Sequence, residues 1–279
     1  MNYRNLFKDK VIIITGTGRS GTTIIGKIIG SMEPCYYLFE PSIMKFYDSV
    51  DAFRSVLFED YWMLQVQGRN VNVNSTEDSY IGNYISRGRI RTREDALNRC
   101  SESKICIKVT EYTWNKFTFD DSFPGTKWVH IHRNGNDVVW SMVKRGWFTD
   151  DYMRSGFLDK TFEGVPWFLS KYAAVGELRD VMLSLDGWTK YNQTTRCAAV
   201  WRSVTEKGID SDMLQIKYEN LSEYDFNSLA DNLGLKISKL TRKHIGSIRK
   251  PVNHPDITGY IQEPEKSRFL ALMNRLEYV

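Results

Sequence analysis

The segment GTGRSGTT at residues 16–23 combines glycines, hydroxyl groups and one cation. Its glycines allow a tight turn in which successive backbone N–H groups point toward one anion. A β-branched run, Val11–Thr15, precedes the segment, and a helical pattern starts at Thr22. The positive end of that helix would face the same anion. The segment is therefore predicted to be a phosphate-binding loop between a strand and a helix.

One position of this loop separates two classes of protein. Gly16 and Gly21 have the spacing of a Walker A loop, and Thr23 occupies its hydroxyl position. Thr22 stands where the lysine of that motif belongs, and threonine cannot supply the charge that holds the β- and γ-phosphates of a triphosphate. The cation is instead Arg19, which suits a ligand with one phosphate and one neighbouring group. A P-loop kinase for a small metabolite is therefore the alternative, not the preferred interpretation.

A second anion-binding pattern lies in RNGNDVVWS at residues 133–141. Arg133 ends the predicted strand KWVHIH, and Ser141 follows eight residues later on the next predicted helix. An arginine at the carboxyl end of a strand and a hydroxyl two turns into the following helix can converge on one phosphate. This spacing predicts a second phosphate contact.

Two carboxylates follow predicted strands and are candidates for a general base. Glu40 follows the strand at residues 36–39, and Glu111 ends KICIKVT. Ligands of open α/β sheets bind at the carboxyl ends of the strands, where such a carboxylate can take a proton from an attacking hydroxyl. We prefer Glu40 as the base. Glu111 is the rival, and either Glu111 or Lys108 could instead position the acceptor.

The two anion-binding patterns resemble those of sulfotransferases that use 3′-phosphoadenosine-5′-phosphosulfate. GTGRSGTT resembles the 5′-phosphosulfate loop in the Arg-Ser-Gly form of bacterial and carbohydrate enzymes, and Arg133 with Ser141 resembles the 3′-phosphate motif. The resemblance implies sulfuryl transfer to a hydroxyl or amine, with adenosine 3′,5′-bisphosphate as product and no metal. It assigns cofactor binding to loop residues and to the second motif: Gly18, Arg19, Ser20, Gly21, Thr22, Thr23, Arg133 and Ser141.

Three further segments extend this resemblance. Tyr218, in KYENL, resembles the Tyr-Glu-x-Leu segment that lies near the nucleotide. Arg249-Lys250 resembles the Arg-Lys-Gly that reaches the 3′-phosphate, although Pro251 replaces the glycine. The segment LFEP at residues 38–41 resembles the Glu-Pro of carbohydrate 6-O-sulfotransferases, which implies Glu40 as the base, and Arg19 would neutralise the leaving phosphate. A non-catalytic nucleotide-binding protein of the same fold is a second alternative.

The alternation of strand and helix patterns predicts an α/β fold, with a P-loop-type parallel β-sheet flanked by helices on both faces. The strands are expected at residues 11–15, 36–39, 104–110, 127–132 and 213–217. The helices are expected from residue 22 to a stop at Pro34, and at residues 134–144, 166–185, 189–207 and 226–233. Gly26 and Gly30 should let the first helix lie close against the sheet.

Residues 1–279 are expected to form one domain, in which residues 42–103 serve as a cap or acceptor-binding insertion. Within this stretch, Arg87, Arg89, Arg91 and Arg93 alternate. These arginines could bind an anionic acceptor or control access of the cofactor, or they could lie on a solvated surface strand. The net charge of +4 is too small to imply nucleic acid, so the expected partner is a small-molecule or glycan acceptor.

Other patterns concern location and metals. The first ten residues are polar and charged, and no run of 18 apolar residues occurs, so no membrane span is expected. The four cysteines show no CxxC pair, which favours reduced thiols in a cytoplasmic protein. His130 and His132 share one strand face without a third ligand, so we expect core or strand-end histidines, not a metal site.

Overall fold

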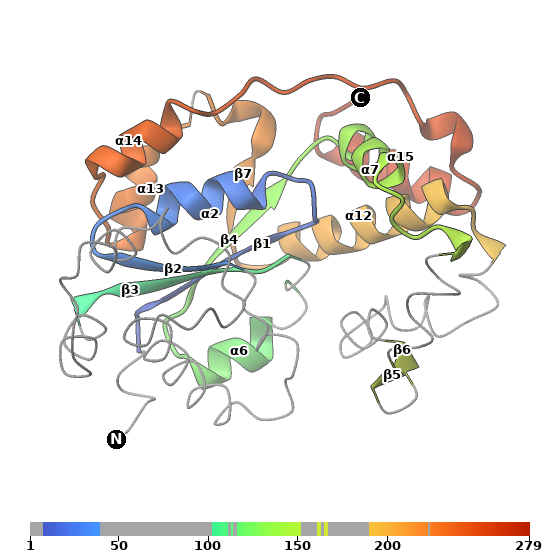
Figure 1. The fold of residues 1–279 in the computed structure, drawn as a ribbon. Helices are drawn as coiled ribbons and strands as arrows, with labels where there is room; N and C mark the ends of the chain where they lie inside the picture. Colours follow the sequence, from blue (N-terminus) through green and yellow to red (C-terminus); the bar gives the residue numbers. More distant parts are fainter. Residues whose placement is uncertain are drawn as a thin grey trace.

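The computed structural model describes residues 8–39, 102–110, 113, 116–151, 161–162, 165–166, 190–222 and 224–279. Their central feature is a five-stranded parallel sheet in the order β2-β3-β1-β4-β7, with helices on both faces (Figure 1). The predicted α/β class is confirmed. Most of the predicted insertion at residues 42–103, including the four alternating arginines, lies outside the described residues.

The strands agree closely with the sequence pattern. They are β1 (Val11–Gly16), β2 (Cys35–Phe39), β3 (Lys104–Lys108), β4 (Lys127–His132) and β7 (Leu214–Lys217). All six residues of β1 are buried, as expected for a central parallel strand with both faces covered. Strand β3 ends at Lys108, two residues before the predicted Thr110.

One face of the sheet is covered by α2 (Thr22–Gly30), α13 (Phe226–Leu233) and α14 (Lys239–Ile245). Helix α2 lies close to the sheet at the two glycines predicted to allow this. A Cβ atom on Gly26 or Gly30 would collide with Tyr37 of β2. The helix ends at Gly30, one turn before Pro34, and the N–H of its C-cap, Ser31, still donates to the carbonyl oxygens of Lys27 and Ile28.

The opposite face carries α6 (Lys116–Ser122) and α12 (Gln193–Ile209), and α15 (Glu265–Arg275) packs against α12. Successive strand residues point to opposite faces, so Trp128, His130 and His132 of β4 all point this way. Trp128 packs edge-to-face on Phe119 of α6, with 5.7 Å between ring centroids. His130 packs so tightly on α12 that a Cβ atom on Gly208 would collide with its ring.

Helix α7 (Gly135–Lys144) follows β4 and packs against α12 and α15 in a shared apolar cluster. Asn134 caps its start, with a side chain that accepts a hydrogen bond of 2.9 Å from the N–H of Asn136. The segment between α14 and α15 crosses above α7 (Figure 1) and includes η4 (Thr258–Tyr260). It is held there by Asp137, whose Oδ1 accepts from the N–H of His254 at 3.0 Å.

Two predicted helices need correction. Pro166 does not begin a helix but ends the two-residue strand β6 (Val165–Pro166), which pairs with β5 (Thr161–Phe162) and leaves proline at the permitted edge of a sheet. The rest of that prediction lies outside the described residues. The helix predicted from residue 189 begins at Gln193, because the side chain of Asn192 caps it at the N–H of Thr195.

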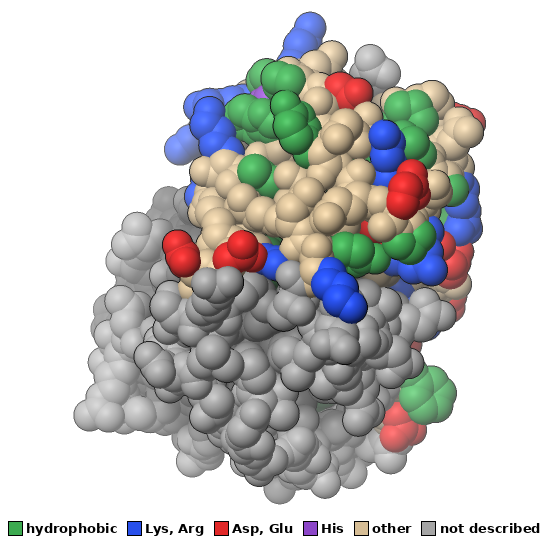
Figure 2. Space-filling model, turned by 90° about the vertical axis from the view of Figure 1, so that its right-hand side faces the viewer, with side chains coloured by type: hydrophobic (Ala, Val, Ile, Leu, Met, Phe, Trp, Pro, Cys, Tyr) green, Lys and Arg blue, Asp and Glu red, His purple; other side chains and the backbone are tan. Residues whose placement is uncertain are grey.

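The described cysteines are Cys35, Cys106 and Cys197, and all three are buried and form no disulfide with one another. Burial raises the pKa of the Cys197 thiol to about 12, so this thiol stays protonated and unreactive near neutral pH. Among the described helices, none has the length and apolar character needed to cross a bilayer. On the face shown in Figure 2, Lys and Arg side chains are spread among Asp and Glu side chains.

Candidate active site

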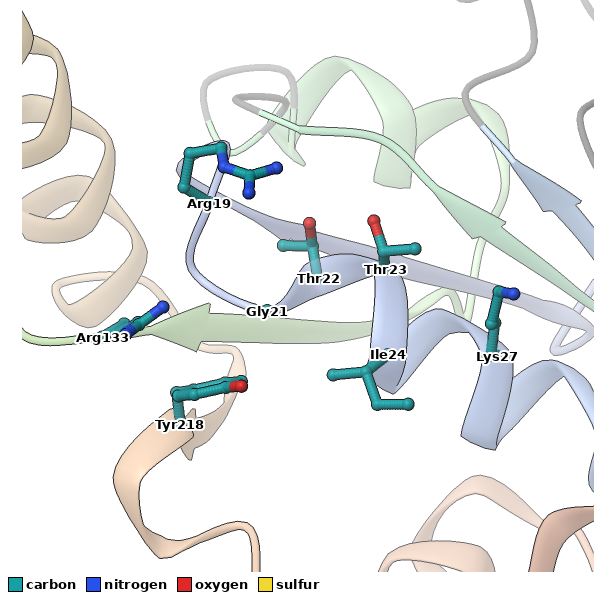
Figure 3. Close-up of a pocket in the computed structure, with 8 residues that line it drawn as sticks. All are labelled: Arg19, Gly21, Thr22, Thr23, Ile24, Lys27, Arg133 and Tyr218. Atoms are coloured by element: carbon teal, nitrogen blue, oxygen red, sulfur yellow. The ribbon is translucent and has the colours of Figure 1, made fainter. Parts of the chain in front are cut away.

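A pocket of about 310 Å³ opens where β1, β4 and β7 end and α2 begins (Figure 3). The residues that line it are Arg19, Gly21, Thr22, Thr23, Ile24, Lys27, Arg133 and Tyr218. Six of these eight were predicted to bind the cofactor. Residues of the loop thus meet residues more than 100 positions away, at the sheet edge where open α/β folds bind ligands.

The loop at residues 16–23, called the phosphate loop below, owes its shape to three left-handed residues. Gly16, Arg19 and Gly21 have φ angles of 143°, 76° and 95°. A Cβ atom on Gly16 would collide with the carbonyl oxygen of Ile131, and one on Gly21 would collide with the ring of Tyr218. Glycine is therefore required at both positions, because the loop backbone lies directly against Ile131 of β4 and against Tyr218, which follows β7.

The loop leads directly into the positive end of α2. Gly21 is the N-cap, no side chain in the described part of the chain caps this end, and the first turn contains no acidic residue. The first N–H groups of a helix lack intrahelical partners and attract anions. Thr22 is buried and Thr23 exposed at this end, and both hydroxyls project toward the side of the pocket where Arg19 lies (Figure 3).

Two buried polar atoms at the site have no hydrogen-bond partner among the described residues. They are the Oγ of Ser20, next to Gly21 in the phosphate loop, and the Nε of Arg133 in the pocket lining. An unsatisfied buried donor costs free energy, so such atoms point to a missing partner. A phosphate, which offers several acceptor oxygens, fits these donors.

Arg19 connects the two predicted anion-binding patterns. Its Nε donates a hydrogen bond of 3.1 Å to the Oγ of Ser141 on α7. Burial lowers the pKa of Arg19, and repulsion from Arg145 and then Arg133 lowers it further. The site therefore concentrates positive charge from several guanidinium groups, which favours a ligand with more than one negative group.

The other side of the pocket is formed by the residues that follow β4 and β7, namely 133–134 and 218–219, called the strand-end wall below. The guanidinium of Arg133 lies over the ring of Tyr218, 4.8 Å from its centroid. Its Nη2 donates to Oδ2 of Asp137 at 3.3 Å, and its carbonyl oxygen accepts from Nε1 of Trp201 at 3.1 Å. Arg133 is thus oriented by three other side chains.

Some predicted site residues lie elsewhere. Gly18 and Ser20 are buried within the phosphate loop and do not line the pocket, and Arg249 is exposed after α14 and does not line it either. Glu40, Glu111 and the arginines at positions 87–93 lie outside the described residues. Lys108 is buried at the end of β3, with its ammonium 4.6 Å from the ring centroid of Phe39.

Two lining residues, Ile24 and Lys27, were not predicted. Lys27 lies one helical turn after Thr23, on the same face of α2, and this i, i+4 spacing was the available signal. The pocket therefore continues along α2 beyond the phosphate loop, with an apolar and a cationic side chain in its wall.

The two histidines of β4 are core residues, as predicted. Burial lowers the pKa of His130 to about 3 and that of His132 to about 4, with Lys217 as a further cause for His132. Both rings are neutral near pH 7. Within the described residues, no three His, Cys, Asp or Glu side chains form a group that could hold a metal ion.

Comparisons with known proteins identify the fold. No family model and no curated protein matches the sequence. The sulfotransferase domain from the Synechococcus PCC 7002 olefin synthase matches the structure with a TM-score of 0.53 and 13% identity, over 98% of this chain and 96% of that one. The sulfotransferase domain from the curacin biosynthetic pathway gives 0.54 and 13%, over 98% of each chain. The chain therefore has the fold of these sulfotransferase domains.

Proposed function

We propose that this protein is a sulfotransferase that moves a sulfuryl group from 3′-phosphoadenosine-5′-phosphosulfate to a hydroxyl or amine of an acceptor. The observation that carries the proposal is a pocket in which a phosphate loop without the Walker lysine faces Arg133 and Tyr218. The hydrogen bond from Arg19 to Ser141 supports it, because it links the two predicted phosphate contacts.

The lining residues fit the chemical groups of this cofactor. The N–H groups that start α2, with Thr22 and Thr23, would hold the 5′-phosphosulfate, and Arg133 with Ser141 would hold the 3′-phosphate. Ile24 and Tyr218 offer an apolar and an aromatic surface for the adenine of the cofactor. The bound cofactor supplies the sulfuryl group and the leaving phosphate, and Arg19 would neutralise the charge that develops on that phosphate.

In this proposal Glu40 is the general base. It directly follows Phe39, the last residue of β2, and the parallel strands β2 and β1 end at the same edge of the sheet. A carboxylate there would take the proton from the acceptor as the acceptor attacks in line. Glu111, which follows β3, is the rival. The acceptor is a small molecule or glycan, with a carbohydrate favoured by the segment at residues 38–41.

We also propose that the protein is cytoplasmic and that it does not bind nucleic acid. The three buried cysteines of the described residues, which form no disulfide with one another, support a reducing compartment. The mixture of charges on the face in Figure 2, together with a net charge of only +4, supports a ligand bound in one pocket over an extended polyanion.

Calorimetry with adenosine 3′,5′-bisphosphate and with ATP plus Mg²⁺ tests the cofactor. The bisphosphate should bind more tightly, and Arg133→Ala should weaken it by about 2 kcal/mol, or roughly 30-fold. Arg268→Ala, which removes an exposed arginine of α15, is the matched control and should change nothing. Tighter binding of ATP would support the metabolite kinase instead, and an unchanged affinity for Arg133→Ala would remove Arg133 from the site.

Glu40→Gln tests the transfer step. The variant should lose transfer to a panel of sugars and small hydroxyl compounds while it still binds the bisphosphate, because the amide cannot accept the proton. Glu111→Gln, tested in parallel, identifies the base if it is the more damaging change. A wild-type protein that binds the bisphosphate and transfers to no acceptor in a broad panel would favour the non-catalytic nucleotide-binding alternative.

A further inference from the structure

The strand-end wall is held together by two neighbouring contacts, each of which joins a residue after β4 to a residue after β7. The guanidinium of Arg133 lies over the ring of Tyr218, while the N–H of the next residue, Asn134, donates to Oε1 of Glu219 at 2.9 Å. Glu219 therefore fixes the backbone immediately after Arg133, at the point where β4 leads into α7. Rotation of Glu219 away from this turn would break that hydrogen bond.

Glu219 is itself held by a residue from the far end of the chain. Its second oxygen, Oε2, accepts a hydrogen bond of 3.1 Å from the hydroxyl of Tyr278, in the turn after α15. The hydroxyl oxygen of Tyr278 lies 3.0 Å from Nδ1 of His132. Because the phenol donates to Glu219, Nδ1 of His132 carries the proton and donates to the phenol. Hydrogen bonds thus run from His132 through the hydroxyl of Tyr278 to the carboxylate of Glu219.

Lys217 holds the ring of Tyr278 from above one face. Its ammonium lies 4.2 Å from the ring centroid and donates to the carbonyl oxygen of Leu276 at 2.9 Å. Burial, followed by the charge of Glu219, raises the pKa of Tyr278. The phenol therefore remains a neutral donor near neutral pH.

A carboxylate beside a proposed phosphate site is unfavourable by charge alone. Glu219 does not line the pocket, and both its oxygens accept hydrogen bonds, one from the turn after Arg133 and one from Tyr278. Its arrangement is that of a residue that orients a neighbour, because one carboxylate oxygen holds the backbone that follows Arg133 and the other is held in place by Tyr278.

We propose that Glu219 and Tyr278 are positioning residues that hold Arg133 in the orientation that binds the 3′-phosphate. This inference rests on the proposed function, in which Arg133 binds that group. It predicts that the two residues set the preference for nucleotides with a 3′-phosphate, although neither touches the nucleotide.

The test compares the affinities of Tyr278→Phe for adenosine 3′,5′-bisphosphate and for adenosine 5′-monophosphate, measured by calorimetry. The ring stays in place under Lys217 and only the hydroxyl is lost. We expect the affinity for the bisphosphate to fall about fivefold and that for the monophosphate to stay unchanged. Glu219→Ala, which also removes the acceptor for Asn134, should lower the bisphosphate affinity about tenfold.

Leu276→Ala is the matched control, because it removes apolar packing from the same turn and leaves the phenol in place. It should lower the unfolding free energy without changing the ratio of the two affinities. If Tyr278→Phe lowers both affinities equally, or lowers neither, the inference is overturned. Arg133→Ala separates the two proposals. A ratio unchanged by Arg133→Ala overturns the proposed function, whereas a ratio changed by Arg133→Ala and not by Tyr278→Phe overturns only the positioning role.

Discussion

The phosphate loop and the strand-end wall face the same pocket and are built by different means. The loop offers backbone N–H groups, and its shape depends on left-handed residues that press against Ile131 and Tyr218. The wall offers one guanidinium, oriented by Asp137, Tyr218 and the turn that follows it. A site made of backbone is damaged by added atoms, whereas a site made of side chains is weakened by the loss of partners.

The largest loss of stability is expected where an added Cβ atom would collide with a backbone atom. Gly16→Ala should lower the unfolding free energy by about 4 kcal/mol, because the new Cβ atom meets the carbonyl oxygen of Ile131 and neither β1 nor β4 can move away. Urea unfolding measures this loss. Gly146→Ala is the control, since Gly146 is also left-handed, with a φ of 71°, but its Cβ would meet nothing within 4 Å. It should cost about 1 kcal/mol. Equal losses would show that backbone strain, not collision, sets the requirement.

The next effect arises where the two regions touch. Gly21→Ala should lower the affinity for adenosine 3′,5′-bisphosphate about 50-fold, because the new Cβ atom displaces the ring of Tyr218 and shifts the loop. A double variant with Tyr218→Ala should be more stable than the Gly21→Ala variant, since the smaller side chain makes room. Thermal unfolding of the two variants decides this, and a double variant no more stable than the single one would contradict the collision.

A fall in pH should lower the free energy of unfolding through β4, the strand that leads into the strand-end wall, and not through the phosphate loop. His130 has a pKa of about 3 in the folded protein and 6.5 when unfolded, so between these values the unfolded chain binds more protons. Stability is therefore expected to fall as the pH drops below 6.5, by about 2 kcal/mol from His130 at pH 5. His132, with a pKa of about 4, adds to the loss. Urea unfolding from pH 7.5 to 5 should show a shallower decline for His130→Leu, and an identical decline would assign the effect to other groups.

The same difference explains which parts of the site the sequence could predict. The phosphate loop is contiguous, and its glycines and hydroxyls carry their signal in order along the chain. The same is true of Arg133 and Ser141, eight residues apart on a strand end and a helix. Glu219 and Tyr278 carry no such signal, because their contact depends on how α15 docks beside β7. The short helices α6 and α14, seven residues each, also escaped prediction, since packing rather than periodicity maintains them.

The smallest effect on affinity is expected from the hydrogen bond between Arg19 and Ser141, which links the two anion-binding patterns. Arg19 was assigned to one phosphate and Ser141 to the other, and their hydrogen bond depends on the left-handed backbone of Arg19, which no residue type at that position predicts. Ser141→Ala should lower the affinity for adenosine 3′,5′-bisphosphate about fivefold, or about 1 kcal/mol, and leave stability nearly unchanged, because Arg19 loses its anchor on α7. Ser228→Ala, on the exposed surface of α13, is the control. If Ser141 acts through Arg19, the effects of Ser141→Ala and Arg19→Gln will not add in the double variant. Additive effects would mean that each side chain serves its own phosphate and that the loop and the wall bind independently.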